Sequence, residues 1–186
     1  MTPEIFSSMT PEKWHLALNH LVFLLPLAAL IPLLIGARCK SRPAMLSGVL
    51  IALLGSGMTG VVMGTGEEAC ERYEEGAVAA YLDAGAEDAL HNHEEMAHTW
   101  SKVMYVLLGV SALGLLIGWI KPKWLPAASQ IVAFLCLASG IAGIAIADTG
   151  GEIRRPDFRD PAAQTSSSSG QSYESHEHDD DDHDHD

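Results

Sequence analysis

Three histidines and two glutamates lie within one eight-residue stretch, residues 91–98, directly before a long apolar segment. If this stretch is helical, the 3.6-residue period places His91, Glu94, Glu95 and His98 along one face and points His93 elsewhere. Glu95 and His98 have the i, i+3 spacing with which helical bundles offer a carboxylate and an imidazole to one metal ion. A solvated acidic helix start, favoured by the helix dipole, explains the same residues without any ligand. The stretch therefore supports a metal-binding hypothesis and a purely structural one.

The charged residues are separated by four apolar segments, although the 186-residue chain is only 48% hydrophobic and 19% charged. Each segment has about the 20 residues that a helix needs to cross a bilayer. They cover residues 16–37, 44–66, 100–120 and 125–147. The pattern predicts an all-α fold, a four-helix transmembrane bundle of a multi-pass membrane protein.

Basic residues in the short connections predict the orientation of this bundle. Residues 38–42 carry three of them and residues 121–123 carry two, so both connections should be cytoplasmic. Residues 67–97 carry ten acidic residues and one basic residue, Arg72, and should form an acidic outer loop with one or two short surface helices. Both termini then lie on the outer side, and the first span serves as an uncleaved signal-anchor.

Three regions follow from this pattern: a short outer segment 1–14, a four-span membrane domain 15–158, and a tail 159–186. The tail is rich in serine and then in histidine and aspartate, a composition that cannot bury a core and predicts disorder. Its histidines would bind transition metals weakly, or the tail is an inert solvating segment. They are His176, His178, His183 and His185.

Polar groups gather at the outer ends of all four predicted spans. His20 lies about one turn inside the first apolar segment, where an ionisable group is costly and usually faces the bundle interior. His15 lies outside that segment and is explained more simply by a hydrogen bond to backbone or a lipid headgroup. The outer ends of a bundle with short connections lie within one bundle diameter of each other. The candidate metal ligands are His20, Glu67, Glu68, His91, His93, Glu94, Glu95, His98 and Asp148.

Imidazole and carboxylate ligands suit a transition metal ion, namely Zn, Fe, Cu or Ni. Haem b is the other cofactor considered, with His20 and His98 as axial ligands and with Arg154 and Arg155 near the propionates. A di-metal oxidase normally has two Glu-x-x-His motifs, whereas this chain has one. A protein without any cofactor also fits the sequence.

Four short motifs in order resemble a bacterial four-span membrane family catalogued as the domain of unknown function 2231 group. They are Leu18-Asn19-His20, Gly64-Thr65-Gly66-Glu67-Glu68-Ala69, His93-Glu94, and Thr149-Gly150-Gly151-Glu152-Ile153-Arg154 followed by Pro156. The resemblance covers roughly residues 15–158 and emphasises His93 and Glu94. It implies a bacterial inner-membrane protein whose termini and 67–97 loop are periplasmic. The chain departs from the family pattern after His20, and has Glu152 and Arg155 where the family often has glutamine and histidine.

The favoured function is therefore a periplasm-facing metal or haem site in redox chemistry or metal handling. The alternative is a non-catalytic accessory subunit whose polar cluster only pins the helix ends, with membrane lipid and a periplasmic or membrane protein as partners. A net charge of −13 without a basic patch excludes nucleic-acid binding. The cytoplasmic half has no buried ionisable residue, which argues against a transporter. No catalytic motif is present, so the sequence predicts no catalytic residue and leaves open whether the protein is an enzyme.

Overall fold

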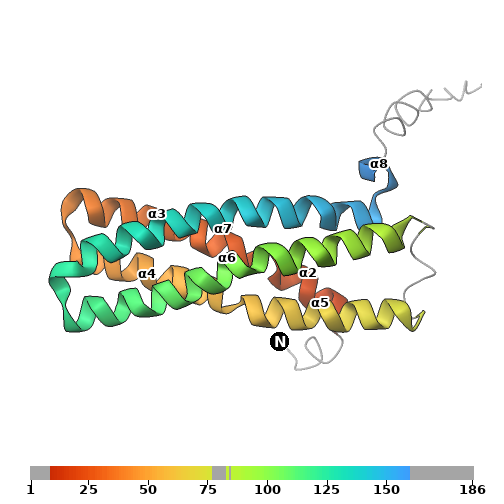
Figure 1. Cartoon of the computed structure of the whole chain (residues 1–186), viewed down its shortest axis with the longest axis horizontal. Coiled ribbons are helices and arrows are strands. Elements are labelled where there is room, and N and C mark those ends of the chain that lie inside the picture. Colours follow the sequence, from red (N-terminus) through yellow and green to blue (C-terminus); the bar gives the residue numbers. More distant parts are fainter. Residues whose placement is uncertain (1–8, 77–82, 84, 160–186) are drawn as a thin grey trace, which may run out of the picture.

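The computed structural model describes residues 9–76, 83 and 85–159, and the four tail histidines lie outside these residues. The described part is entirely helical (Figure 1). Its elements are α2 (Pro11–Leu18), α3 (Leu21–Cys39), α4 (Arg42–Gly57), α5 (Thr59–Glu74), α6 (Ala86–Ile120), the 3₁₀ helix η2 (Pro122–Trp124), α7 (Leu125–Arg154) and α8 (Pro156–Arg159). Four helical segments are long and apolar enough to cross a membrane, namely Pro11–Cys39, Arg42–Glu74, Ala86–Ile120 and Pro122–Arg154. The predicted all-α fold is confirmed, and the four long apolar helices fit a multi-pass membrane protein by length and composition.

Two of these segments contain a break that hardly changes their course. Between α2 and α3, Asn19 and His20 keep right-handed helical dihedrals, with φ of −56° and −69°. Met58 does the same between α4 and α5, with φ of −70°. The α2–α3 pair and the α4–α5 pair are therefore each one continuous helical segment in which the helical hydrogen-bond pattern is interrupted once. The two prolines inside the first segment, Pro26 and Pro32, both lie within α3, which continues through them.

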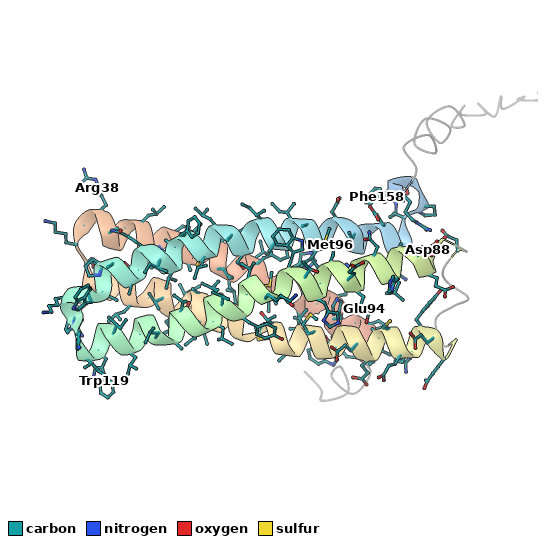
Figure 2. All side chains as sticks on the ribbon, viewed as in Figure 1. Arg38, Asp88, Glu94, Met96, Trp119 and Phe158 are labelled. Atoms are coloured by element: carbon teal, nitrogen blue, oxygen red, sulfur yellow. The ribbon has the colours of Figure 1, made fainter. Side chains whose placement is uncertain are left out.

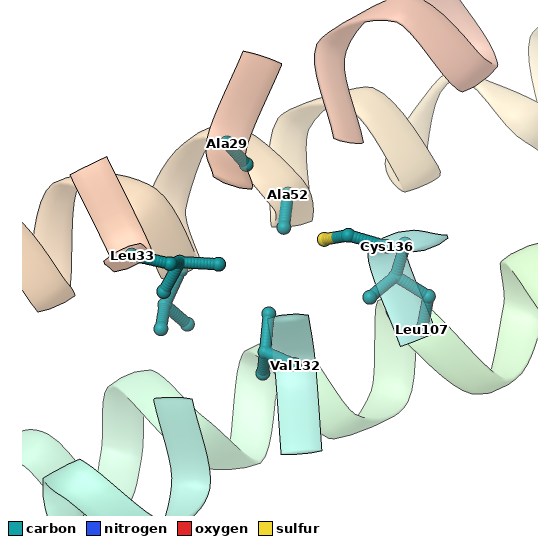
Figure 3. Packing of buried hydrophobic residues seen from close by; sticks show 7 residues of the cluster. Ala29, Leu33, Ala52, Leu107, Val132 and Cys136 are labelled. Atoms are coloured by element: carbon teal, nitrogen blue, oxygen red, sulfur yellow. The ribbon is translucent and has the colours of Figure 1, made fainter. Parts of the chain in front are cut away.

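The middle of the bundle is a core of small and branched side chains contributed by α3, α4, α6 and α7 (Figure 3). Cys136 and Leu107 are fully buried in it, and so are Val49 and Val132. A Cβ added to Gly48 would lie 2.5 Å from Leu33 Cγ, and one added to Gly118 would lie 2.7 Å from Leu46 Cδ2. Small residues thus let these helices approach closely, which is how membrane helices gain packing energy.

Not every small-residue pair has this role. Gly60 and Gly64 have the Gly-x-x-x-Gly spacing that the sequence shares with Gly114 and Gly118. A Cβ added at either Gly60 or Gly64 would meet no described atom within 4 Å, whereas Gly114 and Gly118 pack against neighbouring side chains. The spacing alone does not indicate which pairs pack.

The helices extend well beyond the thickness of a bilayer at one end. Helix α6 has 35 residues, and at 1.5 Å per residue it is about 52 Å long, against about 30 Å for the hydrocarbon core. Residues 67–74 continue α5 and residues 86–97 belong to α6, so these parts of the predicted loop extend two long helices instead of forming short surface helices. Residues 91–98 are helical, which was the condition for placing their histidines and glutamates on helix faces.

The two ends of the bundle differ in charge. We define the acidic end as the end that contains α2, the last turns of α5 and α7, the start of α6, and α8; every acidic residue of the described part lies there. The basic end contains the α3–α4 and α6–α7 connections, with Arg38, Lys40, Arg42, Lys121 and Lys123. Figure 2 shows Arg38 and Trp119 at the basic end, and Asp88, Glu94 and Phe158 at the acidic end.

Candidate functional site

A cavity of about 670 Å³ lies at the acidic end, enclosed by α2, the first turn of α3, α5, α6 and α7. Apolar side chains such as Val22, Phe23, Met63 and Met104 form much of its wall. Clefts of roughly 300–1,000 Å³ with apolar walls and a few converging polar groups are typical of small-molecule and cofactor sites. The polar groups of this cavity therefore decide what it could bind.

His15 of α2 is half-buried in the wall of this cavity, and its orientation is fixed by α5. Its Nδ1 lies 3.0 Å from the backbone oxygen of Val62. A carbonyl oxygen can only accept a hydrogen bond, so Nδ1 carries the proton and donates it. In the neutral ring the lone pair is then on Nε2, the nitrogen left for a ligand.

His93 of α6 is held in the same manner by α7. Its Nδ1 lies 3.0 Å from Thr149 Oγ1, and the Thr149 hydroxyl donates its one proton to the backbone oxygen of Ile146, also at 3.0 Å. Thr149 must therefore accept from His93, which places the proton on Nδ1 and the lone pair on Nε2. Such a bond from the second ring nitrogen is what normally orients a metal-ligating histidine.

The surroundings of the two rings repeat each other. Each ring lies over a glycine that follows a threonine, and each threonine hydroxyl bonds back to the carbonyl three residues earlier. A Cβ added to Gly66 would lie 2.9 Å from His15 Cε1, and one added to Gly150 would lie 3.1 Å from His93 Cε1. The absent side chains at these two glycines therefore leave the space that the two imidazoles occupy.

The two imidazoles are close neighbours inside the cavity. Their ring centroids are 6.4 Å apart, and their planes are perpendicular at 90°. His15 comes from α2 and His93 comes from α6, so the two rings belong to helices that are far apart in the sequence. Two histidines with bonded Nδ1 atoms are thus brought to one place by four helices, which suits ligation by nitrogen.

Further polar atoms in the cavity have no hydrogen-bond partner among the described residues. Thr59 is 2% exposed, and its Oγ1 is unpartnered, as is the buried Oδ1 of Asn19. Both residues line the cavity. Because a buried unpaired polar atom is costly, these two atoms indicate that water or a ligand group completes their bonding.

An ion pair holds the helix that carries His15. Arg72 Nε of α5 lies 2.6 Å from Glu12 Oε1 of α2, and the two side chains are 39% and 29% exposed. Glu12, Glu67 and Glu94 line the cavity together with Lys13 and Arg154, so its rim carries charges of both signs. The Glu12–Arg72 pair adds a second contact between α2 and α5 beside the hydrogen bond of His15 to Val62.

The structure brings some of the predicted site residues to the cavity and leaves others outside it. His93 and Glu94 line it half-buried, and His20, Glu67, His98 and Arg154 line it with exposed side chains. The ring of His20 contacts Phe23, with centroids 5.7 Å apart. Exposed and away from the cavity lie Glu68, His91, Glu95 and Asp148. Within residues 9–76, 83 and 85–159, no three His, Cys, Asp or Glu side chains are close enough to hold one metal ion.

The expected hydrogen bond of His15 to a backbone carbonyl is confirmed, since its Nδ1 bonds to the Val62 oxygen. The sequence did not predict that His15 lines the cavity or that Thr149 bonds to His93. The available signals were the repeated Thr-Gly pairs, Thr65-Gly66 and Thr149-Gly150, and the i, i+4 relation of His15 to Asn19, which puts both on one helix face. The place of His15 in the cavity wall was not predicted because the residue precedes the first apolar segment. The helix continues through that boundary, so the residue still faces the bundle.

Comparison of the chain with protein-family models, with curated proteins and with solved structures returns no match. The geometry of the cavity is therefore the basis on which a function can be argued.

Proposed function

We propose that this chain is a bacterial inner-membrane protein that holds haem b between His15 and His93 and takes part in one-electron transfer at the periplasmic side. The observation that carries the proposal is the pair of imidazoles 6.4 Å apart in one cavity, each with Nδ1 bonded and Nε2 left for a ligand. The proposal keeps the haem hypothesis of the sequence and changes its axial pair from His20 and His98.

The number of ligands favours haem over a bare ion. A protein-bound zinc ion takes three or four protein ligands, and the described residues bring no three His, Cys, Asp or Glu side chains together. Haem iron receives four nitrogens from its own macrocycle and needs only axial ligands from the protein. Two histidines are therefore a complete set for haem and an incomplete one for zinc.

The separation of the rings also favours a haem. With metal–nitrogen bonds of about 2.0–2.1 Å, two imidazoles on opposite sides of one ion have centroids roughly 6 Å apart, and two in a tetrahedral site roughly 5 Å apart. The observed 6.4 Å agrees with ligands on opposite sides. A cavity of about 670 Å³ with apolar walls exceeds what one hydrated ion occupies and suits a planar organic cofactor.

The propionates of a haem need cations or water. Arg154 and Lys13 line the cavity and have exposed side chains, so both can reach the rim. Glu12, Glu67 and Glu94 would repel propionates, which favours binding with the propionates turned toward Arg154 and Lys13 and away from these carboxylates. The unpartnered Thr59 Oγ1 and Asn19 Oδ1 would then bond to water.

Bound haem would supply a one-electron redox centre. His15 and His93 would both hold the haem iron, and a haem held by two histidines would supply one-electron transfer. The carboxylates along α5 and the start of α6 give the acidic end a negative field. Such a field attracts a redox partner with a basic surface and speeds its association.

The test is the visible spectrum and the iron content of the full chain, purified in detergent without a histidine tag. We expect a Soret band and one iron per chain, and we expect His15→Ala and His93→Ala each to lose the band. His91→Ala is the matched control, since His91 is on the same helix as His93 but outside the cavity. Deleting residues 171–186 should remove only weak metal that a chelator also removes.

Three outcomes would overturn the haem proposal. The first is a colourless, folded wild-type protein from cells that make haem. The second is a Soret band that survives in the His15→Ala/His93→Ala double variant. A stoichiometric metal without a Soret band, lost in the His20→Ala/His98→Ala variant, would restore the original ligand hypothesis of a bare ion.

A structural role is the second candidate, because the same contacts tie helices together. His15 joins α2 to α5, His93 joins α6 to α7, and the Glu12–Arg72 pair repeats the first link. In an accessory subunit these bonds would only pin the acidic end, and His15→Ala would lower the melting temperature of a colourless protein. Loss of the Soret band with an unchanged apoprotein melting temperature would exclude this role.

A further inference from the structure

The basic end of the bundle contains a second, smaller cavity of about 360 Å³ between the end of α3, the start of α4, η2 and the start of α7. One part of its wall is apolar, with Met45, Leu125 and Pro126, and the other part is formed by Lys40 and Arg42. This mixture of an apolar wall and two cations differs from the acidic cavity in both charge and position. Nothing in the haem proposal uses it.

The cations of this end have no carboxylates to neutralise them. No acidic residue occurs between residues 13 and 66 or between residues 96 and 147 of the sequence. The ion pairs that the described residues form are Glu12–Arg72, Asp157–Arg155 and Asp83–Arg159, and all are at the acidic end. A positive field therefore remains at the basic end for a ligand from outside the chain to neutralise.

The two cations of the cavity are also positioned by the backbone. Arg42 Nη2 donates to the backbone oxygen of Gly118 on α6 at 3.0 Å, which fixes the guanidinium while its other N–H groups stay available. Lys40 has a left-handed backbone, with φ of 53°, and caps α3 by donating its N–H to the Gly36 oxygen. Glycine or asparagine usually occupies this position, because a residue with a side chain is strained there. The charge of Lys40 also interacts favourably with the C-terminal end of the α3 dipole.

We propose that this cavity binds the headgroup of an anionic phospholipid, with its phosphate between Lys40 and Arg42 and its first acyl carbons against Met45 and Leu125. The occupant is argued from charge complementarity and from depth. The cavity lies where the membrane-spanning segments end, which is the level of lipid headgroups. Basic pockets between transmembrane helices are known to select anionic headgroups by this means.

The test is lipid binding by the full chain in detergent micelles, measured by native mass spectrometry during titration with phosphatidylglycerol and, separately, phosphatidylcholine. We expect phosphatidylglycerol to bind at one site at least about ten-fold more tightly. Lys40→Gly is the informative variant, because it keeps the left-handed turn, relieves its strain and removes the charge. It should weaken phosphatidylglycerol binding at least about ten-fold.

Arg38→Gln is the matched control, since Arg38 is an exposed cation at the same end but does not line the cavity. We expect it to weaken binding by about five-fold at most, the effect of one surface charge near an anionic headgroup. Equal losses in Lys40→Gly and Arg38→Gln would overturn the proposal in favour of a diffuse surface field. No preference of the wild-type protein for phosphatidylglycerol would overturn it outright.

Glycerol phosphate separates a lipid from a free phosphate as the ligand. At concentrations equal to those of phosphatidylglycerol it should leave the lipid bound, because it cannot use the apolar wall. Equal competition would show a site for soluble phosphate and overturn the lipid proposal. The haem proposal is independent of each of these results, because His15 and His93 are at the other end of the bundle.

Discussion

The α3–α4 interface and the acidic end contain similar residues but are packed differently. Between α3 and α4, glycines lie directly against the neighbouring helix: a Cβ at Gly36 would meet the backbone nitrogen of Met45 at 2.7 Å, and one at Gly55 would meet Pro26 Cδ at 2.6 Å. At the acidic end, Gly60 and Gly64 are exposed and have no described neighbour within 4 Å of such a Cβ, and other residues of their helix line a cavity of about 670 Å³. The α3–α4 interface is closely packed, whereas the acidic end contains a cavity.

The difference separates a part of the molecule that contributes packing energy from the part in which we propose a ligand. Membrane helices associate through close packing, because lipid supplies no hydrophobic driving force between them. The cavity at the acidic end lacks these packing contacts and contains two histidines and unpartnered polar atoms. A ligand that filled it would therefore increase the stability of the folded protein. Substitutions in the two regions should therefore change different properties.

The largest expected effect on stability is that of Gly36→Ala in the packed region. The new methyl group would clash with the Met45 backbone, which cannot move as a side chain can, and overpacking of this kind costs about 1–3 kcal/mol. We expect a clear drop in the thermal unfolding temperature in detergent. Gly60→Ala is the matched control and should leave that temperature unchanged or raise it, because alanine favours a helix by about 0.8–1 kcal/mol over glycine. Equal losses in both variants would show that the effect does not come from the contact of Gly36 with Met45.

Next in size is Gly66→Ala, which should damage the site more than the fold. Its Cβ would lie 2.9 Å from His15 Cε1, so the imidazole must shift from its place over the helix. With bound haem, we expect a shifted Soret band and weaker haem retention, with a smaller change in melting temperature than Gly36→Ala gives. Gly64→Ala should keep the wild-type spectrum, because Gly64 is on the same helix and a Cβ added there would meet no described atom within 4 Å. A spectrum unchanged in both variants would argue against His15 as a ligand.

A smaller effect is expected for Arg72→Gln, which removes the partner of Glu12 and loosens α2 against α5. Both side chains are partly exposed, so salt and water screen the pair and its contribution is small. We expect a slight loss of thermal stability that is greatest at low ionic strength and disappears in high salt. Glu71→Gln, an exposed neighbour of Arg72, serves as the control. A loss that does not depend on salt would indicate a packing role for the arginine stem.

The smallest effect concerns the Arg159–Asp83 pair, which connects α8 to the start of α6 at 2.7 Å. The hydrogen bond from Arg159 holds the pKa of the Asp83 carboxyl below its ordinary value. A carboxyl whose folded pKa is lowered stabilises the fold above its unfolded pKa of about 3.9, and this contribution is lost as the pH falls through the folded pKa.

Asp83→Asn should therefore lower the melting temperature slightly at pH 7 and make no difference once the wild-type carboxyl is protonated. Thermal unfolding of both proteins between pH 7 and pH 3 measures this, with the exposed Glu87→Gln as a control. A difference that grows as the pH falls would have the wrong sign and would exclude the pair as its cause.

The sequence alone determined the class of this protein. Four apolar segments of about 20 residues, separated by charges, require helices, because only a helix satisfies its own backbone within lipid. Composition also located the acidic and basic ends, and the periodicity of residues 91–98 was correct for a helix. These features are local and need no contact between distant residues. The orientation in the membrane stays a prediction.

The tertiary structure decided which polar residues meet. Periodicity placed His91, Glu94, Glu95 and His98 on one face of α6 and pointed His93 elsewhere, but which residues turn inward depends on how α6 packs against α5 and α7. The residues that line the cavity are His93, Glu94 and His98, and the histidine that meets His93 is His15, which precedes the first apolar segment. The Val62 carbonyl and the Thr149 hydroxyl fix the two rings from other helices. Such contacts across 47 and 56 residues of sequence follow from the assembly of the bundle, and no local pattern encodes them.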